Sequence, residues 1–382
     1  MHSRRIRTQT GFSLVELTIA LGVSLVLLAG LTAVFVKSSD AQREQERSAE
    51  QIKNGRYAME IISEDLRLAG FYGEFFNLPP RLLAQMPYPS TLPDACDIDP
   101  ADLLNALPFA VQGYAAGNPR PSCVAAANHL AGTDVLVIRH AAAAPLTPGS
   151  SATANDFYLQ ANATAAEIQR PAAAAVLPNP NNKKADGSTA ATIFKKDGAT
   201  GGDIRKYQVH IYFIAPCSVP AGGGADCSGS ADDNGHPIPT LKRLELGPDG
   251  FTVVPLVEGI VNLQIDYGLD ENPASADPST QYPGDGSADR FVKDPARAPL
   301  PAIPTAPATV SNWQNVVSVK VYILARNTKD SPGHTDGKSY NVGIAGYIPA
   351  ANDAYRRHLY SALVRLTNPS SRREIPCAAP CL

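Results

Sequence analysis

The feature that most constrains this chain is an uncharged apolar run from Leu17 to Val36, close to the amino terminus. At about 1.5 Å per residue, a helix of about 20 residues crosses the hydrocarbon core of a bilayer. Arg4, Arg5 and Arg7 precede the run, and positive charge before a first apolar segment holds the amino end in the cytoplasm. The sequence therefore predicts one membrane-spanning helix, with the rest of the chain beyond the inner membrane.

An acidic residue, Glu16, stands directly before this run. A carboxylate at the centre of a spanning helix costs about 2.5 to 3.5 kcal/mol and is usually kept for a partner or a function. Glu16 lies at one end, where the cost is smaller, so an acid in the headgroup region is the alternative. Ordinary secretory signals carry a small residue after the apolar stretch, whereas here Gly11 precedes it. Cleavage at Gly11 would leave the apolar helix on the mature protein.

Residues 11–16, GFSLVE, resemble the class III leader of type IV prepilins and type II secretion pseudopilins. That leader has a glycine, an aromatic residue that becomes the new amino terminus, and a glutamate at the fifth mature position. The resemblance implies that prepilin peptidase removes residues 1–11 between Gly11 and Phe12, that Phe12 is N-methylated, and that the helix moves from the inner membrane into a filament. There Glu16 would make an assembly contact with the amine of Phe12 of a neighbouring subunit, because a charge in an apolar bundle needs a counter-charge. An unprocessed signal anchor is the alternative.

Helical periodicity continues beyond the apolar run, over residues 37–70. Apolar side chains recur there at helical spacing: Ile52, Met59, Ile62, Leu66 and Ala69. Gly70 suits the end of a helix. We therefore expect one helix with a membrane and filament-core half, residues 12–36, and an amphipathic half that packs its apolar stripe on the rest of the protein. Three glycines are candidate break points: Gly22, Gly30 and Gly55.

Strand patterns predominate after residue 70. They occupy six segments: 134–140, 206–216, 240–246, 251–270, 315–326 and 358–369. In residues 315–326, apolar and polar side chains alternate with the period of a half-buried strand. Stretches rich in Gly, Pro and Ala, at about 80–130 and 141–203, are expected to be surface insertions with little regular structure. The order predicts an α+β fold, in which the amphipathic half of the helix packs on the antiparallel sheet of a head, residues 71–382. The resemblance of the leader implies that this fold is pilin-like and that the head is periplasmic.

Four blocks in this order resemble the PilW family of minor pilins. They are NGRYAMEIISEDLRLAGFYG at 54–73, LVEGIVNLQIDYGLD at 256–270, WQNVVSVKVYILAR at 313–326 and YRRHLYSALVRLTNP at 355–369. The resemblance implies a subunit that joins other minor pilins at the pilus tip and primes assembly of the major pilin. A type II secretion minor pseudopilin is the nearer alternative. A pilus-tip adhesin is the farther one, in which the insertions and Trp313 would contact a surface.

Six cysteines in an exported chain indicate disulfides, because the space beyond the inner membrane is oxidising. Pairing of nearest neighbours gives three bonds: Cys96 with Cys123, Cys217 with Cys227, and Cys377 with Cys381. Other connectivities remain open. A zinc site built from Cys217, Cys227 and His236 is a weaker alternative, because it lacks the short Cys-x2-Cys step of common zinc sites.

The sequence gives little sign of a cofactor or of catalysis. Residues 266–290 are rich in acidic groups, and four of them are weak calcium candidates: Asp266, Asp270, Asp285 and Asp289. Their spacing departs from an EF-hand, which favours a solvated turn between two strands. The seven histidines form no HExxH motif, and no GxSxG or P-loop pattern occurs. A net charge of -3 without a basic patch argues against a nucleic-acid partner. We therefore expect no enzyme activity and no cofactor apart from the calcium alternative.

Overall fold

A single α-helix, α1, extends from Leu14 to Leu68 without a break at any of its glycines. The computed structural model describes residue 11 and residues 13–75, 91–147, 151–162, 165–176, 193, 202–270, 285–297 and 312–371. The chain divides into two units, residues 1–50 and 51–382, so the last turns of α1 belong to the second unit. Gly70 follows the helix with a φ of 71°, a left-handed conformation that ends helices at low cost in glycine. The prediction of one long helix is confirmed.

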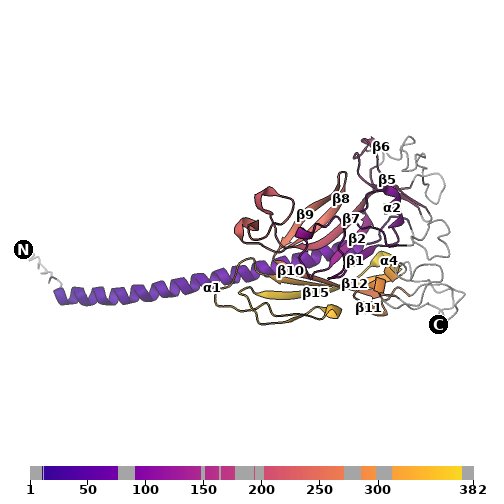
Figure 1. Cartoon of the computed structure of the whole chain (residues 1–382). Helices are drawn as coiled ribbons and strands as arrows, with labels where there is room; N and C mark the ends of the chain where they lie inside the picture. The colour runs from indigo at the N-terminus through magenta and orange to yellow at the C-terminus, as the bar shows by residue number, and fades with distance from the viewer. Residues whose placement is uncertain are drawn as a thin grey trace, which may run out of the picture. The chain divides into compact units, whose positions relative to one another are not determined.

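The strands of the second unit form two larger antiparallel sheets (Figure 1). The first sheet contains β1 (Val111–Tyr114), β2 (Val135–Ala141), β4 (Tyr158–Ala161), β5 (Ala166–Gln169), β7 (Ile204–Ala215), β8 (Thr240–Gly247) and β9 (Gly250–Glu258). The second contains β11 (Arg290–Val292), β10 (Ile260–Leu269), β12 (Val316–Arg326) and β15 (Arg357–Arg365), in that order. The predicted α+β class is confirmed, although the strands make two sheets where one was expected.

Short elements complete the described residues. Two small ribbons pair β3 (Ser151–Ala152) with β6 (Ala175–Val176) and β13 (Tyr340–Asn341) with β14 (Tyr347–Ile348). Two further helices are α2 (Pro100–Asn105) and α4 (Thr367–Ser371), and residues 312–314 are also helical. Single 3-10 turns are η1 (Ala126–Asn128), η2 (Ala221–Gly223), η3 (Asp232–Gly235), η4 (Pro295–Arg297) and η5 (Gly343–Ala345).

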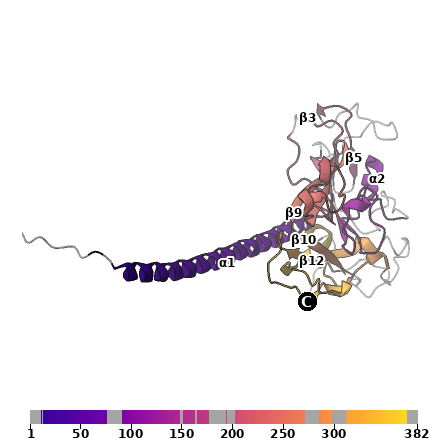
Figure 2. The same cartoon turned by 60° about the vertical axis from the view of Figure 1, so that its left-hand side comes forward.

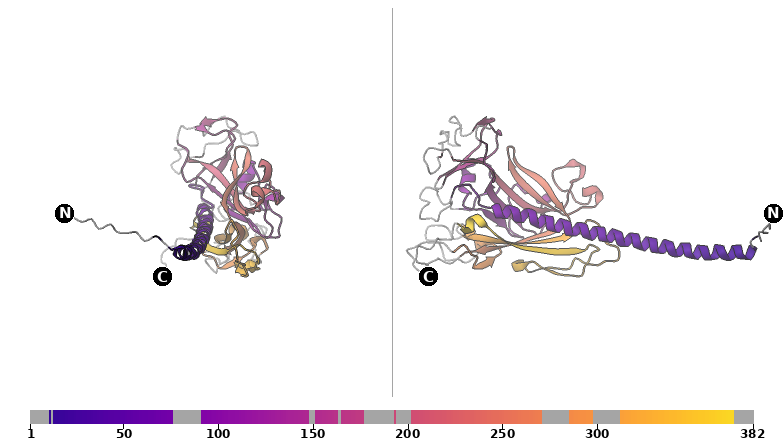
Figure 3. Two further views of the ribbon diagram at one scale, coloured as in Figure 1. Left: turned by 90° about the vertical axis from the view of Figure 1, so that its left-hand side faces the viewer. Right: turned by 180° about the vertical axis from the view of Figure 1, so that it is seen from behind.

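The last turns of α1 share one apolar core with both sheets. Ala58, Ile62 and Leu66 are fully buried there, together with Ile138 of β2 and Val321 of β12. Figures 2 and 3 show the strands of the two sheets on either side of this part of the helix. A second core cluster, which includes Val137 of β2 and Val209 of β7, takes the alternate residues of the first sheet. The central strands of that sheet are therefore buried on both faces.

One member of the predicted apolar stripe is misplaced. Ile52 is 43% exposed, whereas Gln51 and Gly55 take the inward positions at this level of α1. Gln51 donates from its amide to the carbonyls of Ala325 and Arg356, at 3.0 Å each. A Cβ at Gly55 would lie 2.1 Å from a ring carbon of Tyr360, so the helix backbone approaches β15 too closely for a larger side chain. The apolar contact therefore begins only at Ala58.

The strand run at 251–270 is two strands, divided between the two sheets at Gly259. Gly259 has a φ of 78°, and a Cβ there would lie 2.5 Å from the carbonyl oxygen of Arg326. The chain turns at this glycine, so that β9 completes the first sheet and β10 enters the second. The apolar pattern of residues 251–270 does not reveal this turn, because both strands are extended and differ only in the sheet to which they belong.

Two further expectations about exposure are wrong. β12 is buried on both faces rather than half-buried, since η5 covers the polar side: a Cβ at Gly343 would lie 2.5 Å from the hydroxyl of Tyr322. The segment 141–203 was expected to have little regular structure, yet β4 and β5 are buried strands of the first sheet, and α2 and β1 lie within 80–130. β4 and β5 are each only 4 residues long, which is too short to show a clear strand periodicity in a segment rich in alanine.

The exposure of α1 predicts a contrast between two isoleucines. Ile62→Ala is expected to lower the free energy of unfolding by about 2 to 5 kcal/mol, because it leaves a cavity between two sheets. Ile52→Ala is expected to change it by less than about 0.5 kcal/mol, since that side chain is largely solvated. Denaturant unfolding of the full chain in detergent measures both. Equal effects would contradict the burial assigned to α1.

Candidate functional site

The amino-terminal part of α1 presents apolar side chains over its whole surface. Every large apolar side chain from Leu14 to Val36 is more than half exposed. By length and composition, this helix is able to cross a membrane. An isolated helix with such a surface in water would be unfavourable, because burial of apolar area is worth about 25 cal/mol per Å2. The segment therefore needs lipid or other helices around it.

The hydroxyl groups within the apolar segment are already paired. Thr18, Ser24 and Thr32 each donate to a carbonyl one turn earlier in α1, at 2.9, 2.6 and 2.8 Å. In hydrocarbon an unpaired hydroxyl costs several kcal/mol, whereas a bond back to the helix removes that cost. These polar residues are therefore compatible with a lipid or filament interior.

Glu16 caps the start of the helix. Its carboxylate accepts the backbone N–H of Ser13 at 3.2 Å, across the Ser-x-x-Glu spacing of a capping box. It also lies in the first turn, where the helix dipole favours negative charge. The Ser-x-x-Glu spacing of residues 13–16 is the sequence signal for this cap. Gly11, the predicted cleavage residue, is exposed just before the helix, whereas Phe12 lies outside the described residues.

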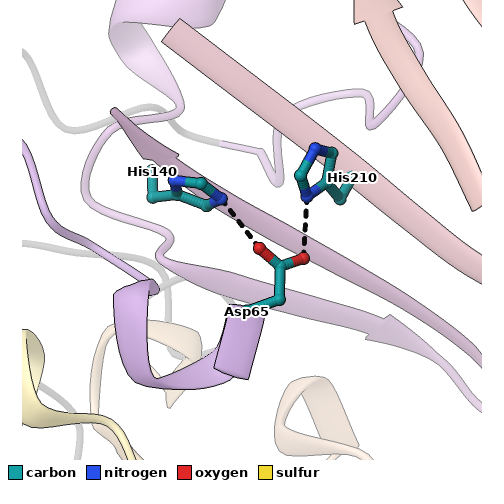
Figure 4. A group of neighbouring side chains, drawn as sticks. All are labelled: Asp65, His140 and His210. Carbon is teal, nitrogen blue, oxygen red and sulfur yellow. Dashed lines mark hydrogen bonds and ion pairs between the residues drawn. The ribbon is translucent and has the colours of Figure 1, made fainter. Parts of the chain in front are cut away.

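A buried acidic residue near the other end of α1 is held by two histidines (Figure 4). Asp65 accepts from Nε2 of His140 and from Nδ1 of His210, each at 2.8 Å. The three side chains are only 8%, 3% and 10% exposed, in that order. In the β2–β7 register, His140 lies opposite Gln208, two residues from His210, so both rings are on the face toward α1. These histidines are far apart in the sequence, and only the pairing of β2 with β7 brings them together.

Further polar groups support this cluster. The Tyr212 hydroxyl donates to Oδ2 of Asp65 at 2.9 Å and accepts from Nη1 of Arg243 at 3.1 Å. Burial raises the pKa of Asp65, but the hydrogen bonds from His140 and His210 outweigh burial and hold that pKa well below its ordinary value. Burial raises the pKa of Tyr212, which keeps its phenol protonated as a donor. Asp65 is therefore an anion that joins α1 to β2 and β7. Two imidazoles and a carboxylate are also a donor set for divalent metals.

The structure contains two of the three disulfides expected from the sequence. Cys96 is bonded to Cys123 and Cys217 to Cys227. Cys377 and Cys381 lie outside the described residues. The bond between Cys217 and Cys227 contradicts the zinc alternative, because a sulfur in a disulfide is not a thiolate ligand, and His236 is exposed.

The loop closed by the second disulfide is ordered by two aspartates. Asp232 accepts the backbone N–H groups of Ala221, Ser228 and Gly229, at 2.7 to 2.8 Å. Asp233 accepts from the backbone of Ser218 at 3.0 Å. Removal from solvent raises the pKa of Asp232, but the donated hydrogen bonds outweigh it and lower the pKa to about 2.

Two of the four calcium candidates accept backbone hydrogen bonds in the described residues. Asp270 accepts the backbone N–H groups of Asp285 and Gly286, at 3.3 and 2.7 Å, which is the role of a turn-forming aspartate. Asp266 instead accepts from the backbone of Ile344, at 3.2 Å. Asp285 and Asp289 are exposed in the chain that leads into β11, and residues 271–284 between the candidates lie outside the described part.

Two comparisons with known proteins gave a match. Residues 228–368 match the sequence model of the PilW family, described as type IV pilus-assembly protein W. The match includes the second and third blocks quoted above and most of the fourth, and it omits α1. Among solved structures, a type IV-like pilin from Thermus thermophilus is similar over 57% of this chain and 86% of its own, with 12% identity and a TM-score of 0.20. No curated protein matches.

Removal of the buried anion is expected to destabilise the second unit strongly. Asp65→Ala should lower the free energy of unfolding by about 3 to 5 kcal/mol, because buried donors on β2 and β7 lose their acceptor. Glu64→Gln is the matched control, since Glu64 is the exposed neighbour. Denaturant unfolding of the full chain compares the two. A loss below about 1 kcal/mol for Asp65→Ala would show that the cluster does not hold α1.

The lowered pKa of Asp232 predicts an acid-sensitive contribution to stability. Its folded pKa of about 2 lies below the ordinary value of 3.8, so the contribution is present above about pH 4 and is lost as pH falls toward 2. Melting temperatures of the native chain and of Asp232→Asn are the measurement. Their difference should be constant from pH 7 to 5 and should narrow between pH 4 and 2. A difference independent of pH would exclude the carboxylate charge as its cause.

Proposed function

We propose that this chain is a minor pilin of a type IV pilus, a subunit of the tip complex that primes assembly. The observation that carries the proposal is the combination, in one chain, of the GFSLVE motif before an exposed apolar helix and the PilW match over residues 228–368. The family match favours a pilus over a type II secretion pseudopilus, which shares the leader and the helix. The role is assembly, without turnover of a substrate.

The mechanism proceeds from the properties of α1. Prepilin peptidase cuts after Gly11, which is exposed, while the apolar segment holds the precursor in the inner membrane. The new amine at Phe12 is methylated. The apolar segment then exchanges lipid for the helices of other minor pilins and of the major pilin, so that its exposed side chains become buried again.

Glu16 determines where the helix docks against a neighbouring helix. Among the described residues its carboxylate accepts a neutral backbone N–H one turn away, at 3.2 Å, a bond that a charged partner could replace. The amine of Phe12 on a neighbouring subunit is a cation, and a charge-assisted hydrogen bond is about twice as strong as a neutral one. Pairing with that amine fixes the height at which one helix stands against the next.

Intact mass of the chain from cells with and without prepilin peptidase tests processing. We expect a species that begins at Phe12 and carries one additional methyl group, found only when the peptidase is present. The same full-length mass in both strains would overturn the prepilin class and leave a membrane-anchored head.

Substitution of Glu16 tests assembly separately from processing. Glu16→Ala should be processed normally but depleted from sheared pili by roughly a hundredfold or more, because a buried counter-charge worth about 3 to 5 kcal/mol is lost. Glu50→Ala is the control, since Glu50 is an exposed acid of the same helix. Equal recovery of both variants in pili would remove Glu16 from the mechanism.

A further inference from the structure

The ring of His140 has a hydrogen-bond acceptor against each of its nitrogens. The carbonyl oxygen of Ala141 lies 3.0 Å from Nδ1, and Oδ1 of Asp65 lies 2.8 Å from Nε2. A neutral imidazole has one N–H, and neither oxygen is a donor when Asp65 is ionised. If Nδ1–H donates to Ala141, the lone pair of Nε2 faces the carboxylate. In that tautomer the lone pair of Nε2 is placed to coordinate a metal ion that lies between the ring and the carboxylate.

Three ligand atoms converge at this point. Nε2 of His140, Nδ1 of His210 and an oxygen of Asp65 all lie within 4.8 Å of one another. Around a tetrahedral zinc ion, with bonds of about 2.0 to 2.2 Å, neighbouring ligand atoms are about 3.4 Å apart. Each of the two nitrogens lies 2.8 Å from a carboxylate oxygen, and all the ligand atoms lie within 4.8 Å of one another, so the spacing around zinc falls within the range that the cluster already spans. Figure 4 shows the two rings approaching the carboxylate from different strands.

The surrounding hydrogen bonds are those that orient metal ligands. A ligating histidine usually donates its other N–H to a backbone carbonyl, and the carbonyl oxygen of Ala141 lies 3.0 Å from Nδ1 of His140, in position to accept such a bond. A ligating carboxylate is usually held by a further donor, as Asp65 is by the hydroxyl of Tyr212. Arg243 in turn donates to that hydroxyl, which fixes its direction. The three ligands are also placed on rigid elements, α1, β2 and β7.

We propose that Asp65, His140 and His210 bind one divalent transition metal ion, with zinc as the first choice, and that the ion fastens the end of α1 to the first sheet. Imidazole nitrogen with carboxylate oxygen suits zinc, cobalt and nickel, whereas calcium and magnesium take oxygen ligands. The site lies in the second unit and does not depend on the pilin proposal. It is distinct from the acidic segment at 266–290.

The test uses the full chain in detergent, purified without a polyhistidine tag and stripped with a chelator. After addition of Zn²⁺ and removal of the excess, elemental analysis should give one zinc per chain. Free Zn²⁺ at about a hundred times its dissociation constant should raise the melting temperature by about 5 °C. Co²⁺ should give the visible absorption of a low-symmetry nitrogen and oxygen site, without the thiolate charge-transfer band, because Cys217 and Cys227 are bonded to each other.

Substitutions locate the ion. His140→Gln and His210→Gln should each abolish stoichiometric zinc and the rise in melting temperature, whereas His236→Gln, at an exposed position, should leave both unchanged. The cobalt spectrum of the unsubstituted chain serves as the test if a variant does not fold. A folded, unsubstituted chain that takes up none of Zn²⁺, Co²⁺ or Ni²⁺ would overturn the proposal, as would binding that persists in both cluster variants. The cluster would then serve only to join α1 to β2 and β7 by hydrogen bonds.

Discussion

The fold of the second unit depends on hydrogen-bond donors that surround the ionised carboxylate of Asp65. A buried charge without partners is highly unfavourable, so α1 can end where it does only if donors are supplied around that residue. His140 and His210 supply them from neighbouring antiparallel strands, and Tyr212 adds a third. Apolar contacts of Ile62 and Leu66 would tolerate small shifts along the helix axis, whereas three directed hydrogen bonds to one carboxylate do not. The charge therefore fixes the register of the helix on the sheet.

The two parts of α1 differ in what surrounds them. From Leu14 to Val36 the helix satisfies its own polar groups and exposes its apolar ones, the requirement of a segment that exchanges lipid for other helices. From Gln51 onward its contacts are specific: the amide of Gln51 bonds to β12 and to the residue before β15, Gly55 lies against Tyr360, and Asp65 lies between two histidines. One uninterrupted helix thus carries an apolar surface that needs lipid or other helices and a specific surface that packs within the second unit.

Sequence periodicity predicted the elements well and their environments poorly. Helical spacing located α1 and Gly70, and six strand patterns located seven of the strands. Alternation could not show that β12 is covered on both faces, because η5, which covers its polar side at Tyr322, comes later in the chain. The Asp65 cluster was missed for a similar reason. His140 and His210 stand inside apolar strand patterns, a signal that each is buried, but only the pairing of β2 with β7 reveals that they meet.

The amide of Gln51 bonds to residues that are synthesised much later than α1. Its two acceptors belong to Ala325 and Arg356, which are 274 and 305 residues later in the chain. A chain that emerges amino end first therefore presents the inner face of α1 long before β12 and β15 exist to cover it. Until then Ile62 and Leu66 are open to other apolar surfaces, including those of other unfinished chains. A chain that ended before β12 would retain the whole of α1 but lack the strands that cover its inner face.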